Sequence, residues 1–309
     1  MPIFDVVVVG AGVIGLTSAL RLQEAGAQVA LVAADPPAET VSAVAAAVWY
    51  PTRTDPDPRV LAWAGETYDE LARQAAAGVP GVAMRPTRMI VRPSDDPWWS
   101  RVVPDYEDHG REWRFSVPTV EMVPYLEWLL ARLADGGTVL ERRRLRGLAE
   151  AAELAPVVVN ATGLAAGELC ADPAVFPARG RIVLVANRGI ETSVRAEHHA
   201  DGMVYVHPRS RDVVLGGTFE PGEWDTGPDP QAARAIVARC VDVVPELAGA
   251  PVLGERAGLR PVRRGGARVG EDPERLPGGA RLIHNYGHGG AGVTLSWGCA
   301  ASVLVDFGP

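Results

Sequence analysis

The stretch Val6-Val7-Val8-Val9-Gly10-Ala11-Gly12-Val13-Ile14-Gly15 decides the fold of this chain. Its valines predict a buried strand that begins at Ile3, and its glycines predict a tight turn into a helix that runs to Ala25 and ends at Gly26. A second strand over 28–32 would complete a βαβ unit. In such a unit the glycines let the backbone approach a pyrophosphate at the helix N-terminus. The opening therefore predicts a dinucleotide-binding domain, and the simpler alternative is a plain glycine turn.

An acidic residue near the end of the second strand usually binds the adenosine ribose of a dinucleotide. This sequence has Ala33 and Ala34 at that place, and Asp35 follows, twenty residues after Gly15. Asp35 is therefore the candidate ribose ligand, although the sequence alone leaves this assignment open.

The composition is that of a globular protein large enough for two domains. The 309 residues are 47% hydrophobic and 22% charged. A formal charge of -8 disfavours the basic surface that nucleic acids require. No apolar run is long enough to span a bilayer, so neither nucleic acid nor membrane is an expected partner.

All 30 basic residues are arginines, because the sequence contains no lysine. This excludes a lysine Schiff base, a lysine nucleophile and the lysine of a phosphate-binding P-loop. Any anion site must use guanidinium groups, backbone amides or helix ends. The three cysteines, Cys170, Cys240 and Cys299, are widely spaced and predict neither disulfides nor a metal site, which favours the reducing cytoplasm.

The middle of the chain alternates between helical and strand patterns. Trp98, Trp99 and Trp113 supply bulk for a second core, and the run 142–144 of three arginines is either a phosphate clamp or a solvated strand edge. The patterns predict helices over 61–77 and 123–133, and strands over 82–91, 138–140, 157–160, 181–185, 203–207 and 213–218.

A second glycine-rich loop, 287–292, lies between a predicted strand over 282–286 and a predicted helix over 293–305. The N-terminus of that helix would stabilise negative charge on part of the cofactor away from the pyrophosphate. The reduced ring of a flavin carries such charge and a nicotinamide does not, so the loop favours a flavin. The alternative is a structural turn in which His288 finds a hydrogen-bond partner locally.

Arg260 is the candidate ligand of a substrate carboxylate. It precedes Pro261, which restrains the backbone to an extended conformation and so presents the guanidinium from a stiff segment. Stiffness suits bidentate recognition of a carboxylate. The alternative is an ordinary solvated arginine.

The sequence resembles the FAD-dependent D-amino acid oxidases over nearly its whole length. The resemblance implies an α/β fold in which a Rossmann-like FAD-binding domain of the GR2 type covers 1–50, 135–178 and 276–309. It implies a second, α+β substrate-binding domain, built on a mixed antiparallel sheet, over 51–134 and 179–275. It rests on the segments 8–16, 44–49, 125–129, 159–163, 179–182, 215–218, 258–263 and 283–290.

The resemblance also implies the residues of the site. Arg260 would bind the substrate α-carboxylate with the hydroxyl of Tyr205, and the carbonyl of Gly290 would accept a hydrogen bond from the substrate amine. No side chain would act as acid or base and no metal would take part. FAD would be held non-covalently by Gly10, Gly12, Val13, Ile14, Gly15, Asp35, Val44, Ala45, Ala46, Val48, Leu145, Thr162, Gly289, Gly290, Gly292, Val293 and Thr294.

The implied reaction is oxidation of a D-amino acid by dioxygen, by hydride transfer to flavin N5, to a 2-oxo acid, ammonia and hydrogen peroxide. Phe219 stands where D-aspartate oxidases carry an arginine, which favours neutral or apolar substrates. Asp201 replaces a tyrosine of the family, which puts an aromatic lid in doubt, and Ala47 replaces a common glycine in the apolar wall 44–48. The alternatives are a D-aspartate oxidase, a glycine or sarcosine oxidase, or a nicotinamide-dependent or other non-oxidase dinucleotide-binding protein. The sequence leaves open whether the protein forms a homodimer.

Overall fold

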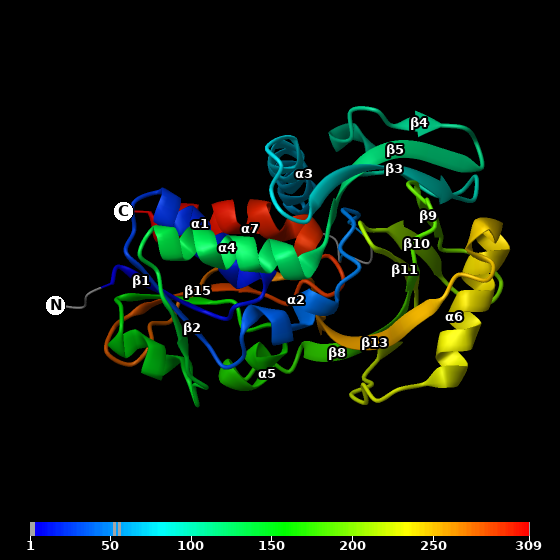
Figure 1. Ribbon diagram of the computed structural model, residues 1–309. Helices are drawn as coiled ribbons and strands as arrows, with labels where there is room; N and C mark the ends of the chain where they lie inside the picture. The colour runs from blue at the N-terminus through cyan, green and yellow to red at the C-terminus, as the bar shows by residue number, and fades with distance from the viewer. Residues whose placement is uncertain (1–3, 52–53, 55–56, 309) are drawn as a thin grey trace.

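The computed structural model describes residues 4–51, 54 and 57–308 (Figure 1). Within these residues the strands form two sheets, one of six strands and one of nine. We call them the first and the second sheet. Ile3, the predicted start of the first strand, lies outside the described residues, and the strand is observed from Val6.

The first sheet is mostly parallel and contains the valine strand at its centre. Residues 6–9 are buried on both faces, as expected of a parallel strand that helices cover from both sides. One edge strand, β14, pairs antiparallel with its neighbour. The order across the sheet is β14 (Arg268–Glu271), β15 (Arg281–Tyr286), β7 (Val157–Asn160), β1 (Val6–Val9), β2 (Val29–Ala33) and β6 (Leu140–Arg142).

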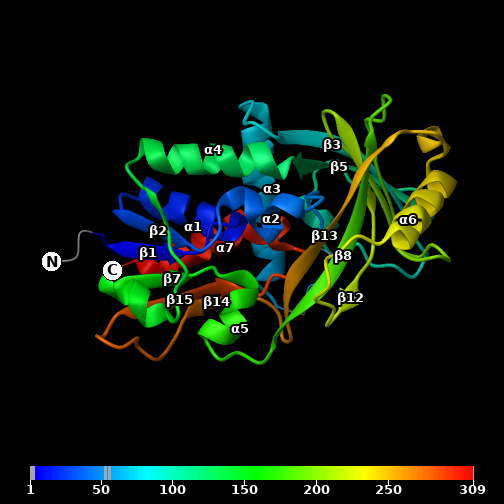
Figure 2. The same ribbon diagram turned by 60° about the horizontal axis from the view of Figure 1, so that its bottom comes forward.

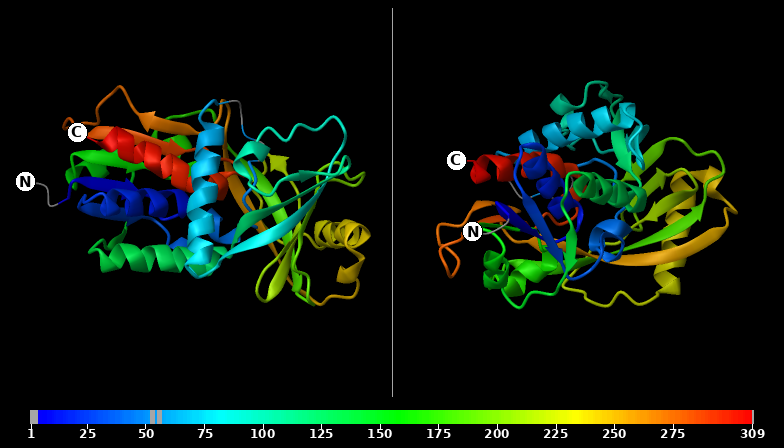
Figure 3. Two further views of the ribbon diagram at one scale, coloured as in Figure 1. Left: turned by 90° about the horizontal axis from the view of Figure 1, so that it is seen from above. Right: turned by 60° about the vertical axis from the view of Figure 1, so that its left-hand side comes forward.

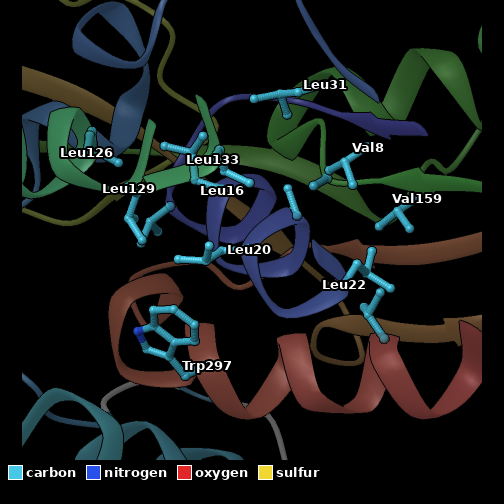
Figure 4. Close-up of a cluster of buried hydrophobic side chains, with 14 of the residues drawn as sticks. Val8, Leu16, Leu20, Leu22, Leu31, Leu126, Leu129, Leu133, Val159 and Trp297 are labelled. Atoms are coloured by element: carbon cyan, nitrogen blue, oxygen red, sulfur yellow. The ribbon is translucent and has the colours of Figure 1, made fainter. Parts of the chain in front are cut away.

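Three helices cover one face of the first sheet: α1 (Val13–Glu24), α4 (Met122–Asp135) and α7 (Gly292–Phe307). They run side by side in the view from above, and α3 (Val60–Ala76) crosses them (Figure 3). Leucines of α1 and α4 and Trp297 of α7 fill the space between helices and sheet (Figure 4). This burial of apolar surface fixes the helices, and with them the glycine turns that precede α1 and α7.

The second sheet is mixed, and its strands are joined mainly antiparallel. α6 (Pro230–Val243) packs on its outer side (Figure 2). The order is β12 (Glu220–Pro221), β8 (Val175–Ala186), β11 (Asp212–Gly216), β10 (Val204–Pro208), β9 (Ser193–Ala196), β3 (Val82–Ile90), β5 (Glu112–Val120) and β4 (Glu107–Asp108), and β13 (Val252–Arg263) pairs along β8.

An aromatic core lies beside the second sheet, as predicted. Trp99 and Trp113 are buried in it with Trp49, but Trp98 is 40% exposed, so its predicted place in that core is wrong. The two adjacent tryptophans lie in a loop, and only one of them can face inward.

The predicted fold class, a Rossmann-like parallel sheet with a second mixed sheet, is confirmed. The predicted helices and strands are present, with ends displaced by a few residues. β8 is much longer than the expected 181–185, and α6, β5, β9, β13 and β14 were not expected as separate elements. The residue boundaries of the two domains stay a prediction.

The short remaining elements are α2 (Val41–Val44), α5 (Ala166–Leu169) and the 3-10 turns Pro37–Glu39, Ser100–Val102, Leu148–Glu153, Gly163–Ala165 and Pro245–Leu247.

Among the described residues, every helix is too short or too polar to cross a bilayer. The three cysteines are free thiols in the same part of the chain. No cluster of three or more metal-ligating side chains is found within it.

Candidate active site

A cavity of about 500 Å³ extends from the glycine turn before α1 to the second sheet. Its lining includes every predicted cofactor and substrate residue except Gly15. The structure therefore brings together residues that lie more than 280 positions apart in the sequence, from Gly10 to Thr294.

Gly15 has a packing role. A Cβ at Gly15 would overlap the carbonyl group of Gly10, so the absence of a side chain lets α1 pack against the turn that precedes it. Gly10 itself has φ 116, and a Cβ there would overlap the carbonyl of Ala161. α1 begins after Gly12, and the N–H of Val13 donates to Oγ of Ser42 at 3.0 Å. Gly12, Val13 and Ile14 line the cavity, so this helix N-terminus faces it.

The second glycine loop places another helix N-terminus on the cavity. α7 begins at Gly292 without a side-chain cap, and the N–H of Gly289 donates to the carbonyl of Pro261 at 2.8 Å, which joins the loop to β13. Nε2 of His288 is buried without a hydrogen-bond partner among the described residues, and burial lowers the pKa of His288 to about 4. The alternative of a structural turn, in which His288 finds its hydrogen-bond partners locally, is therefore wrong for Nε2 of His288.

The far end of the cavity, beside the first sheet, is lined by Asp35, Arg143 and Arg144. Nη2 of Arg144 lies 3.6 Å from Oδ1 of Asp35. Two of the three consecutive arginines thus line the cavity, whereas Arg142 ends β6 and is exposed. Arg143 also pairs with Glu141 and Glu150, and the side chain of Arg144 is 76% exposed. The phosphate clamp, its alternative of a solvated strand edge and the ribose role of Asp35 therefore stay predictions.

Arg260 lies on β13 with its guanidinium above Gly180 of β8, where a Cβ would overlap it. Nη1 of Arg260 donates to the carbonyl of Thr218 at 3.1 Å, and Cζ lies 5.6 Å from the ring centroid of Phe219. No carboxylate of the described residues lies within 4.0 Å of the guanidinium. The sheet orients the planar guanidinium of Arg260, and its remaining N–H groups can donate hydrogen bonds to a carboxylate from outside the chain.

Tyr205 lies on β10, directly opposite Gly216 of β11. Its ring occupies the space that side chains at Gly216 and Gly217 would fill. Burial raises the pKa of Tyr205, although Arg260 and Arg195 oppose the rise, so the hydroxyl stays protonated at neutral pH and can donate a hydrogen bond. The Gly-Gly pair before Thr218 therefore makes room for the tyrosine.

Two cavity residues, Arg195 and Tyr50, were not predicted. Arg195 is opposite Tyr205 in the register of β9 and β10, and its Cζ lies 4.3 Å from the ring centroid of Tyr50. Burial raises the pKa of Tyr50 well above its usual value. Arg195 sits in a four-residue strand with no motif, so only the pairing of the strands reveals it.

The other residues near Tyr205 divide into two groups. His207 lines the cavity and stacks on Tyr205 with ring centroids 5.0 Å apart, and burial keeps its pKa well below the usual value. Arg209 pairs with Asp212 at 2.6 Å and does not line the cavity. Asp201 is exposed and also outside the lining, so this position supplies no aromatic lid.

The predicted apolar wall 44–48 lines the cavity where α2 ends. Ala47 has φ 53, a conformation that glycine adopts without strain, which explains why a glycine suits this position. The N–H of Val120 donates to the carbonyl of Ala47 at 2.8 Å and fixes the wall to β5.

The cavity fits FAD by its shape and its donors. Two helix N-termini face it, the first turn contains glycines without room for a Cβ, and an apolar wall lies between that turn and the second sheet. A dinucleotide with a flavin ring requires a pyrophosphate site, an apolar slot and a separate site for charge on the ring.

Comparisons with known proteins agree with this geometry. A family model described as FAD dependent oxidoreductase matches residues 5–304. The D-amino-acid oxidase of Rubrobacter xylanophilus is 48% identical over 95% of this chain and 93% of that protein. The D-amino-acid oxidase of Streptomyces coelicolor is 44% identical over 96% of this chain and 94% of that protein.

Among solved structures, glycine oxidase from Geobacillus kaustophilus has a TM-score of 0.77 at 20% identity, over 98% of this chain and 94% of that chain. This likeness shows the shared fold. The chain therefore belongs to the FAD-dependent oxidoreductases and, within them, to the D-amino-acid oxidases, and FAD is its expected cofactor.

Proposed function

We propose that this protein catalyses the FAD-dependent oxidative deamination of D-amino acids. The observation that carries the proposal is the Arg260 guanidinium, which has no carboxylate partner among the described residues and shares with the buried Tyr205 hydroxyl one end of the cavity. The products would be a 2-oxo acid, ammonia and hydrogen peroxide, with dioxygen as the second substrate. FAD, when bound, accepts the hydride from Cα and returns the electrons to dioxygen.

The protein would act mainly by positioning the substrate. Arg260 and Tyr205 hold the α-carboxylate, and the carbonyl of Gly290 accepts from the amine, so that Cα–H is directed along the cavity toward the apolar wall. An L-amino acid held at the same two points would direct its hydrogen away. The selectivity for the D-enantiomer would follow from these two attachment points together with the fixed side of the cavity from which the hydride is accepted.

No side chain needs to move a proton during the hydride step if the substrate binds as its free amine. His207 is held neutral by burial, and Tyr205 stays protonated. The N-terminus of α7 stabilises negative charge gained by the cofactor.

We place neutral or apolar D-amino acids first among the substrates. Phe219 packs against Arg260 where an additional arginine would favour a second carboxylate. D-aspartate oxidase and glycine or sarcosine oxidase activity are the alternatives. A panel of D-amino acids, glycine and sarcosine, scored by peroxide release, separates them.

We propose that FAD is bound non-covalently and that the enzyme works in the cytoplasm. The free cysteines support a reducing compartment. Gel filtration of the purified protein would decide between a monomer and a homodimer.

Replacing Arg260 tests the proposed substrate site. Arg260→Ala should lower kcat/KM for a neutral D-amino acid by the equivalent of about 2–5 kcal/mol, because the α-carboxylate loses its half-buried guanidinium partner. Arg260→Lys should also be impaired, since an ammonium cannot replace the planar fork. Arg256→Ala, an exposed position on the same strand, is the control and should be unchanged.

A normal kcat/KM in Arg260→Ala, with FAD content equal to that of the wild type, would contradict the assignment. FAD content is measured from the absorbance of the flavin released on denaturation. It separates loss of substrate recognition from loss of the cofactor.

A further inference from the structure

A second cavity, of about 190 Å³, adjoins the apolar wall 44–48. Ala46, Val48 and His207 line both this cavity and the larger one described above, so the two cavities are neighbours. At about 30 Å³ for each water molecule, the second cavity has room for about six waters or for one small organic molecule. The proposed reaction makes no use of this space.

The second cavity exists because β9, which lies between β3 and β10, is short (Figure 1). β9 pairs with β3 only from Thr87 onward and with β10 only up to Val206. Beyond these residues, the described chain places no strand between the start of β3 and the turn that follows β10. Glu121 spans this gap, because its carboxylate accepts from the N–H of Ser210 at 2.6 Å and from the hydroxyl of Ser210 at 3.0 Å.

Arg85 of β3 lines the second cavity and lacks a partner. Its Nε is buried, and its guanidinium makes neither an ion pair nor a hydrogen bond with any other described residue. The other charged side chains of the lining do have partners, since Arg209 pairs with Asp212 and Glu121 binds Ser210. A half-buried guanidinium without acceptors is unfavourable, so an acceptor from outside the chain would stabilise Arg85.

The lining indicates the chemistry of that acceptor. The planar guanidinium of Arg85 favours an anion that accepts two hydrogen bonds, as a carboxylate does. The negative charge of Glu121 disfavours a ligand with two charges. An apolar body on the ligand is favoured over a strongly hydrated inorganic anion, because the rest of the lining includes Ala46, Val48, Val82, Val120 and Pro208.

We propose that the second cavity is a binding site for a small monocarboxylate with an apolar body, in which Arg85 binds the carboxylate. This site is separate from the substrate site at Arg260 and goes beyond the proposed function. A ligand in it would contact Ala46 and Val48, and so would reach the wall against which the flavin ring is expected to lie.

The test counts the binding sites for isobutyrate, a branched monocarboxylate that has no amine to be oxidised. In calorimetric titrations the wild-type holoenzyme should bind isobutyrate at two sites, one at Arg260 and one in the second cavity. Arg260→Ala should lose the first site and keep the second. Arg85→Met should keep the first site and weaken the second by at least about ten-fold, the effect of losing a hydrogen bond to a charged donor.

Arg88 supplies a matched control. It lies on β3 close to Arg85, pairs with Glu112 at 3.6 Å and lines neither cavity. Arg88→Met should leave both isobutyrate sites unchanged. A single site in the wild type that Arg260→Ala abolishes, or equal weakening of the second site in Arg85→Met and Arg88→Met, would overturn the proposal.

A second variant keeps the test decisive if Arg85→Met does not fold. Ala83 also lines the second cavity, so Ala83→Leu fills part of this space and retains Arg85. Ala83→Leu should abolish the second isobutyrate site and leave the FAD content unchanged. Unchanged affinity at the second site in Ala83→Leu would contradict the proposal.

The second site should also affect turnover through the apolar wall. Isobutyrate bound at Arg260 competes with D-leucine and raises only KM, whereas isobutyrate in the second cavity contacts Ala46 and Val48 and should lower kcat. Arg85→Met should remove the effect on kcat and keep the effect on KM. A kcat that isobutyrate leaves unchanged in the wild type, or lowers equally in Arg85→Met, would contradict this coupling.

The calorimetric test does not depend on turnover. If the wild-type holoenzyme oxidises no D-amino acid, the proposed function fails, but a site for isobutyrate that Arg85→Met weakens and Arg260→Ala retains would still support the second cavity as a binding site.

Discussion

Gly180 lies beneath the guanidinium of Arg260, and its lack of a side chain determines where that guanidinium can lie. Gly180→Ala should therefore displace Arg260 and lower kcat/KM by roughly 10²-fold, since a misplaced anchor disturbs the whole substrate pose. FAD content should not change. Steady-state kinetics of Gly180→Ala and Gly254→Ala would check this, because a Cβ at Gly254 on β13 meets nothing within 4 Å and should be harmless.

The hydroxyl of Tyr205 has a smaller expected effect. Tyr205→Phe keeps the ring over the two glycines and removes one hydrogen bond to the carboxylate. The loss in kcat/KM should correspond to about 0.5–1.5 kcal/mol. If Tyr205→Phe binds a carboxylate-containing inhibitor as tightly as the wild type does, Tyr205 is not part of the substrate site.

Single residues differ in how far the sequence reveals them. Arg260 could be singled out because Pro261 stiffens the segment and the family resemblance covers 258–263, and Gly10 because it follows a buried strand. Arg195 could not, because its place beside Tyr205 depends on the register between two strands. The alternation of side chains along a strand says which residues share a face, but only the pairing says which strand lies next to it.

At the scale of elements, the crossing of α3 and α7 depends on Gly298. A Cβ at Gly298 would overlap the backbone of Trp63, so the two helices touch without a side chain between them. Alanine favours a helix by about 1 kcal/mol relative to glycine. The steric overlap of its Cβ with Trp63 destabilises the fold by more than this.

Gly298→Ala should therefore lower the free energy of unfolding by about 1–3 kcal/mol, measured by urea denaturation of the holoenzyme. Gly65→Ala in α3 is the comparison, because its Cβ would meet only the side chain of Val102, at 3.1 Å. A larger loss in Gly65→Ala than in Gly298→Ala would contradict this account of the crossing.

The elements themselves were predicted unequally. Helices α1, α3, α4 and α7 have strong apolar periodicity or clear glycine ends, and all four were expected. β13 was expected only as a stiff extended segment around Arg260, because its alternating small and charged residues lack the apolar pattern of a buried strand. β13 forms a strand because it pairs with β8 along its full length, and the sequence of β13 alone does not show this pairing.

At the scale of the whole molecule, Asp172 joins the two sheets. It accepts hydrogen bonds at 2.8 Å from Nε of Arg263 at the end of β13 and from the hydroxyl of Tyr286 at the end of β15. Burial alone would raise the pKa of Asp172, but these donors outweigh it and hold the pKa at about 2.

This link should make stability depend on pH. The folded pKa of Asp172 lies below that of the unfolded chain, so the stabilisation, about 2 kcal/mol, is present above about pH 4 and is lost as the pH falls toward 2. Asp172→Asn should remove it at neutral pH. Urea unfolding at a series of pH values checks this, with Asp201→Asn at an exposed position as the control; equal stability of Asp172→Asn and wild type at neutral pH would contradict it.

The two-sheet architecture could be predicted from the glycine turns and the family resemblance, whereas the ties between the sheets could not. Asp172, Arg263 and Tyr286 lie far apart in the sequence and belong to no common motif. Such long-range hydrogen bonds depend on how the two sheets are oriented, and no local sequence pattern predicts that orientation.

The central claim, that Arg260 and Tyr205 present a D-amino acid to FAD in this cavity, is tested most directly without oxygen. The holoenzyme is mixed anaerobically with D-leucine or with L-leucine, and the visible absorbance of the oxidised flavin is followed. We predict rapid bleaching with D-leucine, none with L-leucine, and strongly slowed bleaching in Arg260→Ala. Bleaching by both enantiomers at similar rates, or by neither D-leucine nor any other D-amino acid, would contradict the account.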